Sequence, residues 1–383
     1  MTNPTTLNIA VVGLGFGEDF LPIYRDHPHV GDVGIVDPDV QRLTDIGDRY
    51  GVKHRYRDFD DVLTDQHWDA IHILAPVKFH ADYAIRTMQA GKHCACAVPM
   101  ATELDELEAI LAVQAATGMT YMMMETTVYS REFRGLTALH ESGDLGQLTL
   151  YDGIHVQNLD GYPHYWLGYP PMKYLTHALS PVLQLTGSVV QDVVAYGTGR
   201  LTNERRGGEY DNPFPTEVGL FRLSNTEAVA DITMSFFQTA RPYIEGFNVY
   251  GSKRSVEWPA LDDDPMRMFE LLPLDPEQSD TGLRGRRSSV GTLDFDDGET
   301  RLPKSLVKYL RPYQVPTPIG GTPTKVPAHG GSHPHLVHEF ISSIMENRPP
   351  MIDTATSAAW TAPGICAHQS ALQDGERITV PRY

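Results

Sequence analysis

Residues 7–24 read LNIAVVGLGFGEDFLPIY and place a strand, a turn and a helix in succession. The β-branched apolar run of residues 9–12 predicts a buried strand, and the apolar spacing of residues 20–24 predicts a helix. Between them, Gly13 permits a tight turn and Gly15 lets a ligand approach the backbone. This order predicts a site for a pyrophosphate at the positive N-terminus of the helix.

The glycine pattern departs at one position from the strict G-x-G-x-x-G spacing. Gly17 comes one place early and Glu18 occupies the position of the third glycine, although Phe16 and Gly17 still complete the predicted cofactor turn. The next apolar run, VGIVDPD, brings Asp37 to a point about 20 residues downstream, as a dinucleotide site requires. A carboxylate there accepts both hydroxyls of the adenosine ribose and repels a 2′-phosphate, so the pattern predicts NAD as the cofactor.

Strands and helices continue to alternate as far as residue 126. Apolar runs at 68–76, 91–98 and 119–129 predict strands, and periodic segments between them predict helices. Such alternation predicts a Rossmann-type doubly wound parallel sheet, whose ligand lies beyond the carboxyl ends of the strands. The residues that fall at these ends, and are predicted to contact the cofactor, are Ala75, Pro76, His80, Pro99 and Glu125.

Length and composition indicate a folded protein of two domains. The chain has 383 residues, which is more than one hydrophobic core usually organises. Its 31 Lys and Arg against 49 Asp and Glu give a formal charge of −18, which disfavours nucleic acid as a partner. The N-terminus carries no signal for export or membrane insertion, so we expect a cytoplasmic protein, and three cysteines without a second cluster predict no metal site.

Beyond residue 126 the pattern changes to alternating aromatic and polar residues. We expect residues 1–126 to form the NAD-binding domain and 127–383 an α+β substrate-binding and oligomerisation domain with a large, mainly antiparallel open sheet. One face of such a sheet packs internally and the other is available to a partner subunit, which predicts a homo-oligomer. Residues 259–328 predict an extended excursion or arm, and the last helix is expected at about 334–347.

Several strings together resemble the Gfo/Idh/MocA family of NAD(P)-dependent sugar oxidoreductases. They are GLGFG, VD, ILAPVKFHADYAIRTMQAGKH, ALHESGDLGQL and HPHLVHEFISSIMENRPPMID. Members of that family carry Glu-Lys-Pro where this chain has Ala97-Val98-Pro99, and the lysine takes part in proton transfer. Valine cannot take up or deliver a proton, so either the chemistry is lost or another group performs it.

Three further strings resemble a branch of the family that oxidises glycosides at C3. CAVPMAT, YMMMETTVYSREF and PPMKYLTHALSP are similar to that branch, which also lacks the lysine. Its relatives include NAD-dependent glycosidases, some of which act on sulfoquinovosides. The resemblance implies hydride transfer from a sugar ring carbon to NAD, with a redox-neutral glycosidase cycle open to the same residues. The alternative is a catalytically silent NAD-binding scaffold or regulatory protein, for which Val98 is the main argument.

The resemblance also selects a catalytic pair. His177 matches a histidine that the family uses beside the substrate, and Lys173 stands four residues earlier, where many members carry aspartate. Positions i and i+4 share a helix face, so both heads can reach one hydroxyl. An imidazole titrates near neutrality and suits a general base, which predicts His177 as the base and Lys173 as its electrostatic partner. Without that family placement, a solvated lysine and a core histidine explain the same spacing.

The remaining candidates are predicted substrate contacts. The loop at 158–171 is dense in aromatic and polar residues, which suits stacking on a sugar, although rigid loop packing explains it equally well. Guanidinium groups match carboxylate or sulfonate oxygens and serve if the glycoside is anionic. The predicted substrate contacts are Tyr129, Arg131, His155, Asp160, Trp166, Arg241 and His333.

Overall fold

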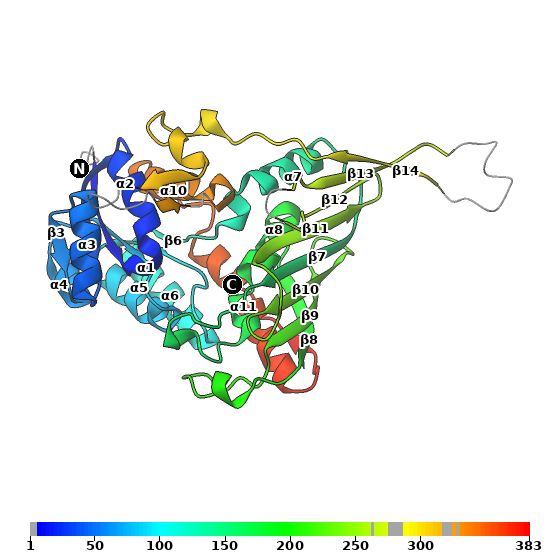
Figure 1. Ribbon diagram of the computed structural model, residues 1–383, viewed down its shortest axis with the longest axis horizontal. Helices are drawn as coiled ribbons and strands as arrows, with labels where there is room; N and C mark the ends of the chain where they lie inside the picture. The colour runs from blue at the N-terminus through cyan, green and yellow to red at the C-terminus, as the bar shows by residue number, and fades with distance from the viewer. Residues whose placement is uncertain (1–5, 262–263, 275–285, 316–323, 327–328) are drawn as a thin grey trace. The chain divides into compact units, whose positions relative to one another are not determined.

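The structure of the chain is a computed structural model (Figure 1). It describes all residues except 1–5, 262–263, 275–285, 316–323 and 327–328. The chain forms two compact units. The first consists of Met1–Ser130 with Asp297–Ile365 and Tyr383, and the second of Arg131–Asp296 with Cys366–Arg382. Among the described residues, none of the helices combines the length and apolar character needed to span a membrane.

The first unit is built on a six-stranded sheet in the order β3-β2-β1-β4-β5-β6. All of its strand pairs are parallel, so the prediction of a Rossmann-type doubly wound sheet is confirmed. The strands are β1 (Leu7–Val12), β2 (Val30–Val36), β3 (His54–Tyr56), β4 (Ala70–Ile73), β5 (His93–Cys96) and β6 (Tyr121–Met123).

Short helices connect these strands, and their ends follow local sequence signals. The helix α3 begins after Asp39, whose side chain accepts hydrogen bonds from the amides of Gln41 and Arg42, and it ends at Gly51 in the left-handed region. The helices of this part are α1 (Leu14–Gly17), α2 (Leu21–Asp26), α3 (Val40–Tyr50), α4 (Phe59–Thr64), α5 (His80–Gln89) and α6 (Leu104–Thr117).

A later segment of the chain completes the core of the first unit. The helix α10 (Ser332–Met345) contacts α2, and its apolar residues join the same buried cluster as those of β1 and α2. The Tyr309 hydroxyl donates to the Pro22 carbonyl at 3.1 Å, which ties the preceding turn to α2. Residues 297–365 were expected in the second domain, and they pack with the first because α10 needs an apolar surface to cover. This segment also contains the hairpin of β15 (Tyr313–Val315) and β16 (Thr324–Val326).

The second unit carries a nine-stranded sheet in the order β14-β13-β12-β11-β7-β10-β9-β8-β17. Every neighbouring pair is antiparallel except β7 with β10, which confirms the predicted, mainly antiparallel sheet. The strands are β7 (Leu148–Val156), β8 (Val190–Thr198), β9 (Thr216–Leu223), β10 (Val229–Ser235), β11 (Ile244–Gly251), β12 (Arg254–Glu257), β13 (Arg267–Leu271), β14 (Ser288–Thr292) and β17 (Ile378–Thr379).

Part of the predicted excursion at 259–328 is regular structure. β13 and β14 pair antiparallel and extend the sheet beyond β12, as Figure 1 shows. This part of the predicted excursion or arm is therefore paired strand, because backbone pairing with the sheet edge satisfies strand hydrogen bonds without a hydrophobic pattern. The part of this segment at 275–285 lies outside the described residues.

The last helix is not the one expected at 334–347. That helix is α10, and it is followed by α11 (Thr354–Leu372), which crosses from one unit to the other at residues 365 and 366. Trp360, Ala362 and Cys366 are all buried, so α11 lacks the polar face that makes a helix recognisable in a sequence.

One face of the second sheet is covered by α8 (Thr176–Thr186), which contacts β7, β10 and β11. The approach is close at Gly153 of β7, where an added Cβ would lie 2.2 Å from the Ala178 carbonyl oxygen. The Tyr151 hydroxyl donates to the same oxygen at 2.6 Å. The helix is therefore held against the sheet at the residue that follows His177. The neighbouring helix α7 (Arg131–Glu141) packs beside α8.

Candidate active site

The glycine turn of the first unit has the geometry that a pyrophosphate requires. Gly13 has a φ of 91°, and a Cβ there would lie 2.5 Å from the Leu74 carbonyl oxygen, so only glycine fits. A Cβ on Gly17 would lie 2.9 Å from a methyl carbon of Val11, which explains the close packing of turn and strand. A Cβ on Gly15 would meet no atom of the chain within 4 Å. Packing within the chain does not require glycine at this position, whereas close approach of a ligand does.

Asp37 lies beside this turn, directly after β2. Its carboxylate accepts hydrogen bonds from the Leu14 amide and from the Asp39 amide, each at 2.9 Å. Arg42 approaches the same carboxylate at 3.4 Å. The predicted ribose-binding acid is thus fixed next to the predicted phosphate-binding turn. Together with the open position at Gly15, these residues fit a dinucleotide.

His80 connects two of the predicted strand-end loops. Its Nδ1 lies 2.7 Å from the Pro99 carbonyl oxygen and its Nε2 lies 2.9 Å from the Ala75 carbonyl oxygen. The ring is buried, and this burial lowers the pKa of His80. His80 therefore positions the loops that follow β4 and β5, and Pro76 begins the short turn between Ala75 and His80.

Glu125 completes the residues predicted at this edge, and Val98 stands where the family carries its lysine. Glu125 is fully buried after β6, and its carboxylate accepts a hydrogen bond from the Thr127 amide at 3.0 Å. Val98 is only 4% exposed, so the position of the family lysine holds a buried aliphatic side chain. The first unit therefore offers no proton-transfer group at that position.

The second unit gathers imidazole, carboxylate and phenol groups on the sheet face that α8 covers. We call this set the histidine cluster, and its members are His155, Tyr174, His177, Tyr243 and Glu245. The His177 Nδ1 lies 3.5 Å from the Glu245 carboxylate, and the Tyr243 hydroxyl donates to the other oxygen of that carboxylate. The ring of His155 lies 5.6 Å from those of His177 and Tyr243. His155 is 1% exposed and His177 is 6% exposed.

Strand register explains how residues far apart in sequence meet in this cluster. β11 pairs antiparallel with β7 so that Glu245 lies directly opposite His155. Directly opposite residues project from the same face of a sheet, and Tyr151 and Gly153 show that this face meets α8. His177 lies on α8, beside the contact at Ala178.

The predicted partner Lys173 does not belong to the same α-helix as His177. It lies in the 3₁₀ turn η5 (Pro171–Tyr174), and α8 begins at Thr176. Leu175 joins the two with helical φ and ψ of −65° and −22°, so the backbone runs helically from one residue to the other. Because a 3₁₀ turn is wound more tightly than an α-helix, Lys173 and His177 do not have the exact i and i+4 relation expected within one α-helix.

A buried carboxylate anchors the turn that carries Lys173. Glu217 of β9 is fully buried, and its Oε2 accepts a hydrogen bond from the Met172 amide at 2.8 Å. Its Oε1 lies 2.7 Å from Nδ1 of His368 on α11. Glu217, with its partner His368, therefore holds η5 against β9.

Aromatic rings border the histidine cluster. Tyr174 contacts the rings of His155 and His177, and the predicted Trp166 contacts Tyr174 edge-on at 5.5 Å. Asp160, in the same loop, forms a salt bridge with Arg205, which lowers the pKa of that carboxyl. The structure thus brings Trp166 to the cluster through Tyr174 and engages Asp160 with Arg205.

The other predicted substrate residues lie in different surroundings. Arg131 contacts Glu132 and lies over the Phe295 ring, and Arg241 donates to the Pro242 and Ala260 carbonyls. These two residues belong to the second unit.

Tyr129 and His333 belong to the first unit. The Tyr129 ring packs against the hydrophobic core, where burial raises its pKa. His333 stacks on Phe20 at 4.4 Å and lies 5.6 Å from the Phe16 ring of the glycine turn. His333 is therefore a neighbour of the predicted cofactor turn within its own unit.

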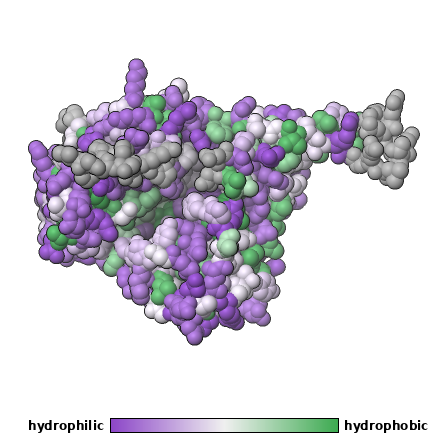
Figure 2. Space-filling model, in the orientation of Figure 1, coloured by the Kyte–Doolittle hydropathy of each residue, from purple (hydrophilic) through white to green (hydrophobic). Residues whose placement is uncertain are grey.

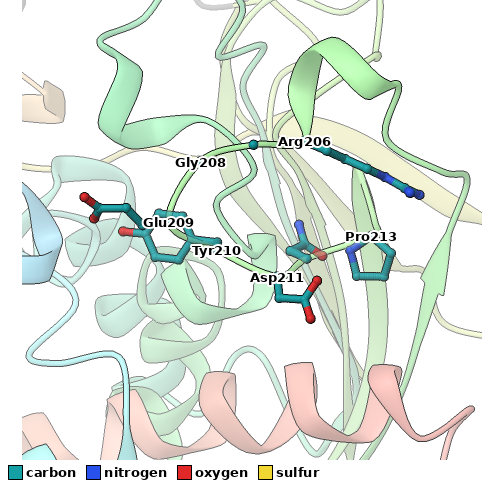
Figure 3. A pocket seen from close by; sticks show the side chains of 8 residues that line it. Arg206, Gly208, Glu209, Tyr210, Asp211 and Pro213 are labelled. Carbon is teal, nitrogen blue, oxygen red and sulfur yellow. The ribbon is translucent and has the colours of Figure 1, made fainter.

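A separate hollow of about 340 Å³ is lined by residues 206–213 (Figure 3). Arg206 and Glu209 point in opposite directions in this view, so their charges do not converge on one ligand position. The loop instead supports the aromatic segment, because Tyr210 contacts the Tyr169 ring at 4.9 Å and the Asn212 amide donates to the Tyr169 carbonyl.

Sequence reasoning missed three members of the histidine cluster. Tyr174, Tyr243 and Glu245 carry no motif of their own, and the last two lie about 90 residues from His155 along the chain. The alternation of polar and apolar residues in β11 indicated a strand, but only the pairing of β11 with β7 places Glu245 opposite His155.

Comparisons with known proteins agree with this architecture. The profile of a family described as "Oxidoreductase family, NAD-binding Rossmann fold" matches residues 7–125. A glycosyl hydrolase family 109 protein of Phocaeicola vulgatus is 31% identical over 351 residues, covering 82% of this chain and 68% of that protein. A 4-carboxy-2-hydroxymuconate-6-semialdehyde dehydrogenase of Sphingobium sp. is 24% identical over 246 residues, covering 60% of this chain and 72% of that protein.

Solved structures share the fold along nearly the whole chain. Levoglucosan dehydrogenase in complex with NADH and levoglucosan aligns with a TM-score of 0.74 at 18% identity, covering 98% of this chain and 100% of that one. The likeness at this identity concerns the fold alone. Since the glycine turn, the strand order, the matched profile and the relative of 31% identity all agree, the chain belongs to the Gfo/Idh/MocA family of oxidoreductases, whose first domain is an NAD-binding Rossmann fold.

Proposed function

We propose that this protein is an NAD-dependent oxidoreductase that removes a hydride from a ring carbon, C3, of a sugar or glycoside. The observation that carries the proposal is the buried His177 with Glu245, a partly buried carboxylate 3.5 Å away, in a chain where Val98 replaces the family lysine. A buried imidazole beside a carboxylate is suited to general base catalysis. The names of relatives, among them glycosyl hydrolase family 109 and levoglucosan dehydrogenase, support a carbohydrate substrate.

The proposed chemistry assigns one task to each residue. NAD, when bound, accepts the hydride. Loss of a hydride from a secondary alcohol requires loss of the hydroxyl proton, which His177 accepts at Nε2 because its Nδ1 faces Glu245. Glu245 holds the imidazole in this tautomer, in the way an acid orients a histidine in other catalytic sets. Lys173 stabilises the negative charge that develops on the substrate oxygen.

A second stage of the proposal is a redox-neutral glycosidase cycle. Oxidation at C3 acidifies the hydrogen at C2, so a base can remove it while the group at C1 departs with its bonding electrons. Water then adds across the double bond, and the C3 ketone would be reduced again with the hydride that the bound cofactor would supply. The net change is hydrolysis with no consumption of NAD. An anionic glycoside such as a sulfoquinovoside is one candidate substrate. The cationic groups predicted for it are Arg131, which contacts Glu132 in this structure, and Arg241, which donates to two backbone carbonyls.

Incubation with aryl glycosides in deuterated water tests the two stages separately. If the cycle operates, the released sugar carries deuterium at C2 and no NADH accumulates. If the enzyme is a simple dehydrogenase, NADH forms in proportion to the substrate while the glycosidic bond stays intact. If neither product forms with any glycoside of a broad panel, both stages are contradicted.

A catalytically silent NAD-binding scaffold is the second candidate, and Val98 is the observation that favours it. The discriminating measurement is turnover by Lys173→Ala and His177→Ala. If the wild-type protein turns over a glycoside and neither change slows it, the catalytic assignment is wrong. If no glycoside reacts while NAD is found in the purified protein, the scaffold is favoured.

We also propose that the protein is a cytoplasmic homo-oligomer that uses the outer face of the second sheet. Val229 pairs with Leu150, and Leu220 lies on the neighbouring strand with the same orientation. These three apolar side chains are between 37% and 52% exposed, whereas the view in Figure 2 is largely hydrophilic. Light scattering should give a dimer or larger assembly, and Leu220→Asp should shift it toward monomer. A monomeric wild-type protein would contradict this proposal.

A further inference from the structure

Asp32, His54 and His67 converge at the surface of the first unit, away from the predicted cofactor turn. The His67 Nε2 lies 3.0 Å from the Asp32 Oδ2, and the His54 Nε2 lies 4.0 Å from the same oxygen. The two imidazole rings are 5.0 Å apart. One ligand atom from each of the three side chains lies within 4.8 Å of the others. We propose that these three residues bind a divalent late first-row transition metal ion, with Zn²⁺ as the representative.

The donor set matches this class of ion. Two neutral imidazoles and one carboxylate form the protein part of many zinc sites, in which a water molecule takes the remaining position. Bond lengths of about 2.0–2.1 Å in a tetrahedral site place neighbouring ligand atoms about 3.3 Å apart. The observed separations of 3.0 and 4.0 Å lie on either side of that value. Small side-chain rotations therefore suffice to close the site around an ion. Mg²⁺ and Ca²⁺ prefer oxygen ligands and fit less well.

Asn8 fixes two of the three ligands relative to each other. Its side-chain oxygen accepts a hydrogen bond from the Asp32 amide at 3.0 Å, and its side-chain nitrogen donates to the His67 carbonyl at 2.9 Å. One residue of β1 thus ties the ligand on β2 to the ligand that precedes β4. Outer partners of this kind orient metal ligands and reduce the disorder that binding must remove.

A second network holds the loop that carries His67. The Lys92 ammonium donates to the Asp65 and Trp68 carbonyls at 2.8 and 2.9 Å. The Trp68 indole donates to the Tyr56 hydroxyl, which donates in turn to the Asp65 carboxylate. His67 therefore belongs to a rigid loop although it lies at the surface. These hydrogen bonds distinguish Asp32 and His67 from a chance pair of flexible side chains.

The position of the site suggests a structural role. His54 begins β3, Asp32 lies near the start of β2, and His67 precedes β4 by three residues. In a parallel sheet these starts lie at one edge, opposite the carboxyl ends where the dinucleotide is expected. A bound ion would cross-link β2, β3 and the loop before β4. Binding should therefore stabilise the first unit without changing its affinity for NAD.

Cobalt binding tests the proposal directly. Tag-free protein is treated with EDTA, dialysed and titrated with Co²⁺, followed by Zn²⁺ titration in a calorimeter. We expect one equivalent of Co²⁺ to produce visible absorption of a low-coordinate site, which Zn²⁺ then displaces. Asp32→Asn and His67→Ala should each weaken binding at least about tenfold, and Asn8→Ala should weaken it less. The matched control His29→Ala changes an exposed histidine of the same unit and should bind as the wild type does.

Each alternative result overturns the proposal. Absence of Co²⁺ and Zn²⁺ binding at micromolar concentrations contradicts it, as does equal affinity of the wild type, Asp32→Asn and His67→Ala. Thermal melting in EDTA verifies that each variant folds. Asp32→Asn preserves the shape of the side chain and the backbone bond to Asn8, so it decides the question if His67→Ala is unstable. NAD affinity is measured in parallel, so that a failure of the metal-site proposal can be distinguished from a failure of the proposed oxidoreductase function.

Discussion

In the proposed mechanism Glu245 acts on the substrate through His177, so its contribution should disappear when His177 is changed. We expect Glu245→Gln to lower kcat about 10²-fold or more with little change in NAD affinity, because the imidazole loses the partner that fixes its tautomer. In a His177→Gln background the same change should have little further effect, since the two residues act as a unit. Glu257→Gln on the neighbouring strand is the control. Additive losses in the double variant would show that Glu245 has a separate, structural role.

The glycine turn offers a prediction in which two glycines behave oppositely. Gly13→Ala should destabilise the fold, because its Cβ would lie 2.5 Å from the Leu74 carbonyl oxygen at a φ of 91°. Gly15→Ala should leave the melting temperature nearly unchanged, because its Cβ meets nothing within 4 Å. Calorimetric titration with NAD should then give at least about tenfold weaker binding for Gly15→Ala. Unchanged affinity in that variant would remove Gly15 from the cofactor site.

At the scale of the element, the contact between α8 and the sheet controls the position of His177. Gly153→Ala would place a Cβ 2.2 Å from the Ala178 carbonyl oxygen and should lower the free energy of unfolding by about 1–3 kcal/mol. Gly291→Ala, on β14, introduces a Cβ with nothing within 4 Å and should stay within about 0.5 kcal/mol of the wild type. Urea titration measures both, and kcat should fall only for Gly153→Ala. Equal stability of the two variants would show that α8 is not tightly seated.

At the scale of the whole molecule, two buried histidines make the first unit sensitive to acid. Burial lowers the pKa of His27 and of His72 from 6.5 to about 3. Their stabilising contribution is present above pH 6.5 and is lost as the pH falls toward 3, because the unfolded chain binds protons that the folded one excludes. Below pH 6.5 the free energy of unfolding should fall less steeply with decreasing pH in His27→Gln than in the wild type. The difference should be on the order of 1 kcal/mol per pH unit. Calorimetry at pH 7.5 and 5.5 checks this, and an unchanged slope would contradict it.

The sequence predicts most of this fold for identifiable physical reasons. The glycine turn, Asp37 and the strand-end residues of the first unit follow from short-range patterns, and the structure places Asp37 beside Leu14 of that turn. The helix α11 was missed because its buried residues leave no polar face to give a periodic pattern. Residues 297–365 were assigned to the wrong part because packing partners are not encoded locally.

The candidate active site and the proposed metal site also depend on contacts that the local sequence does not encode. His177 was predicted from a resemblance, whereas Glu245 depends on the register between β7 and β11. Asp32, His54 and His67 come from three separate segments that only the parallel sheet brings together. Side chains that meet through long-range strand pairing have no signature in a single sequence.

The role of His177 as the base is tested by rapid mixing of the NAD-loaded protein with glycosides, while reduced nicotinamide is followed by its absorbance. We expect at least one glycoside to reduce the nicotinamide in the wild-type protein. His177→Gln, with equal NAD content, should do so at least about 10²-fold more slowly. Equal rates in the two proteins would contradict the assignment of His177 as the base, and the catalytic account of the histidine cluster would have to be abandoned.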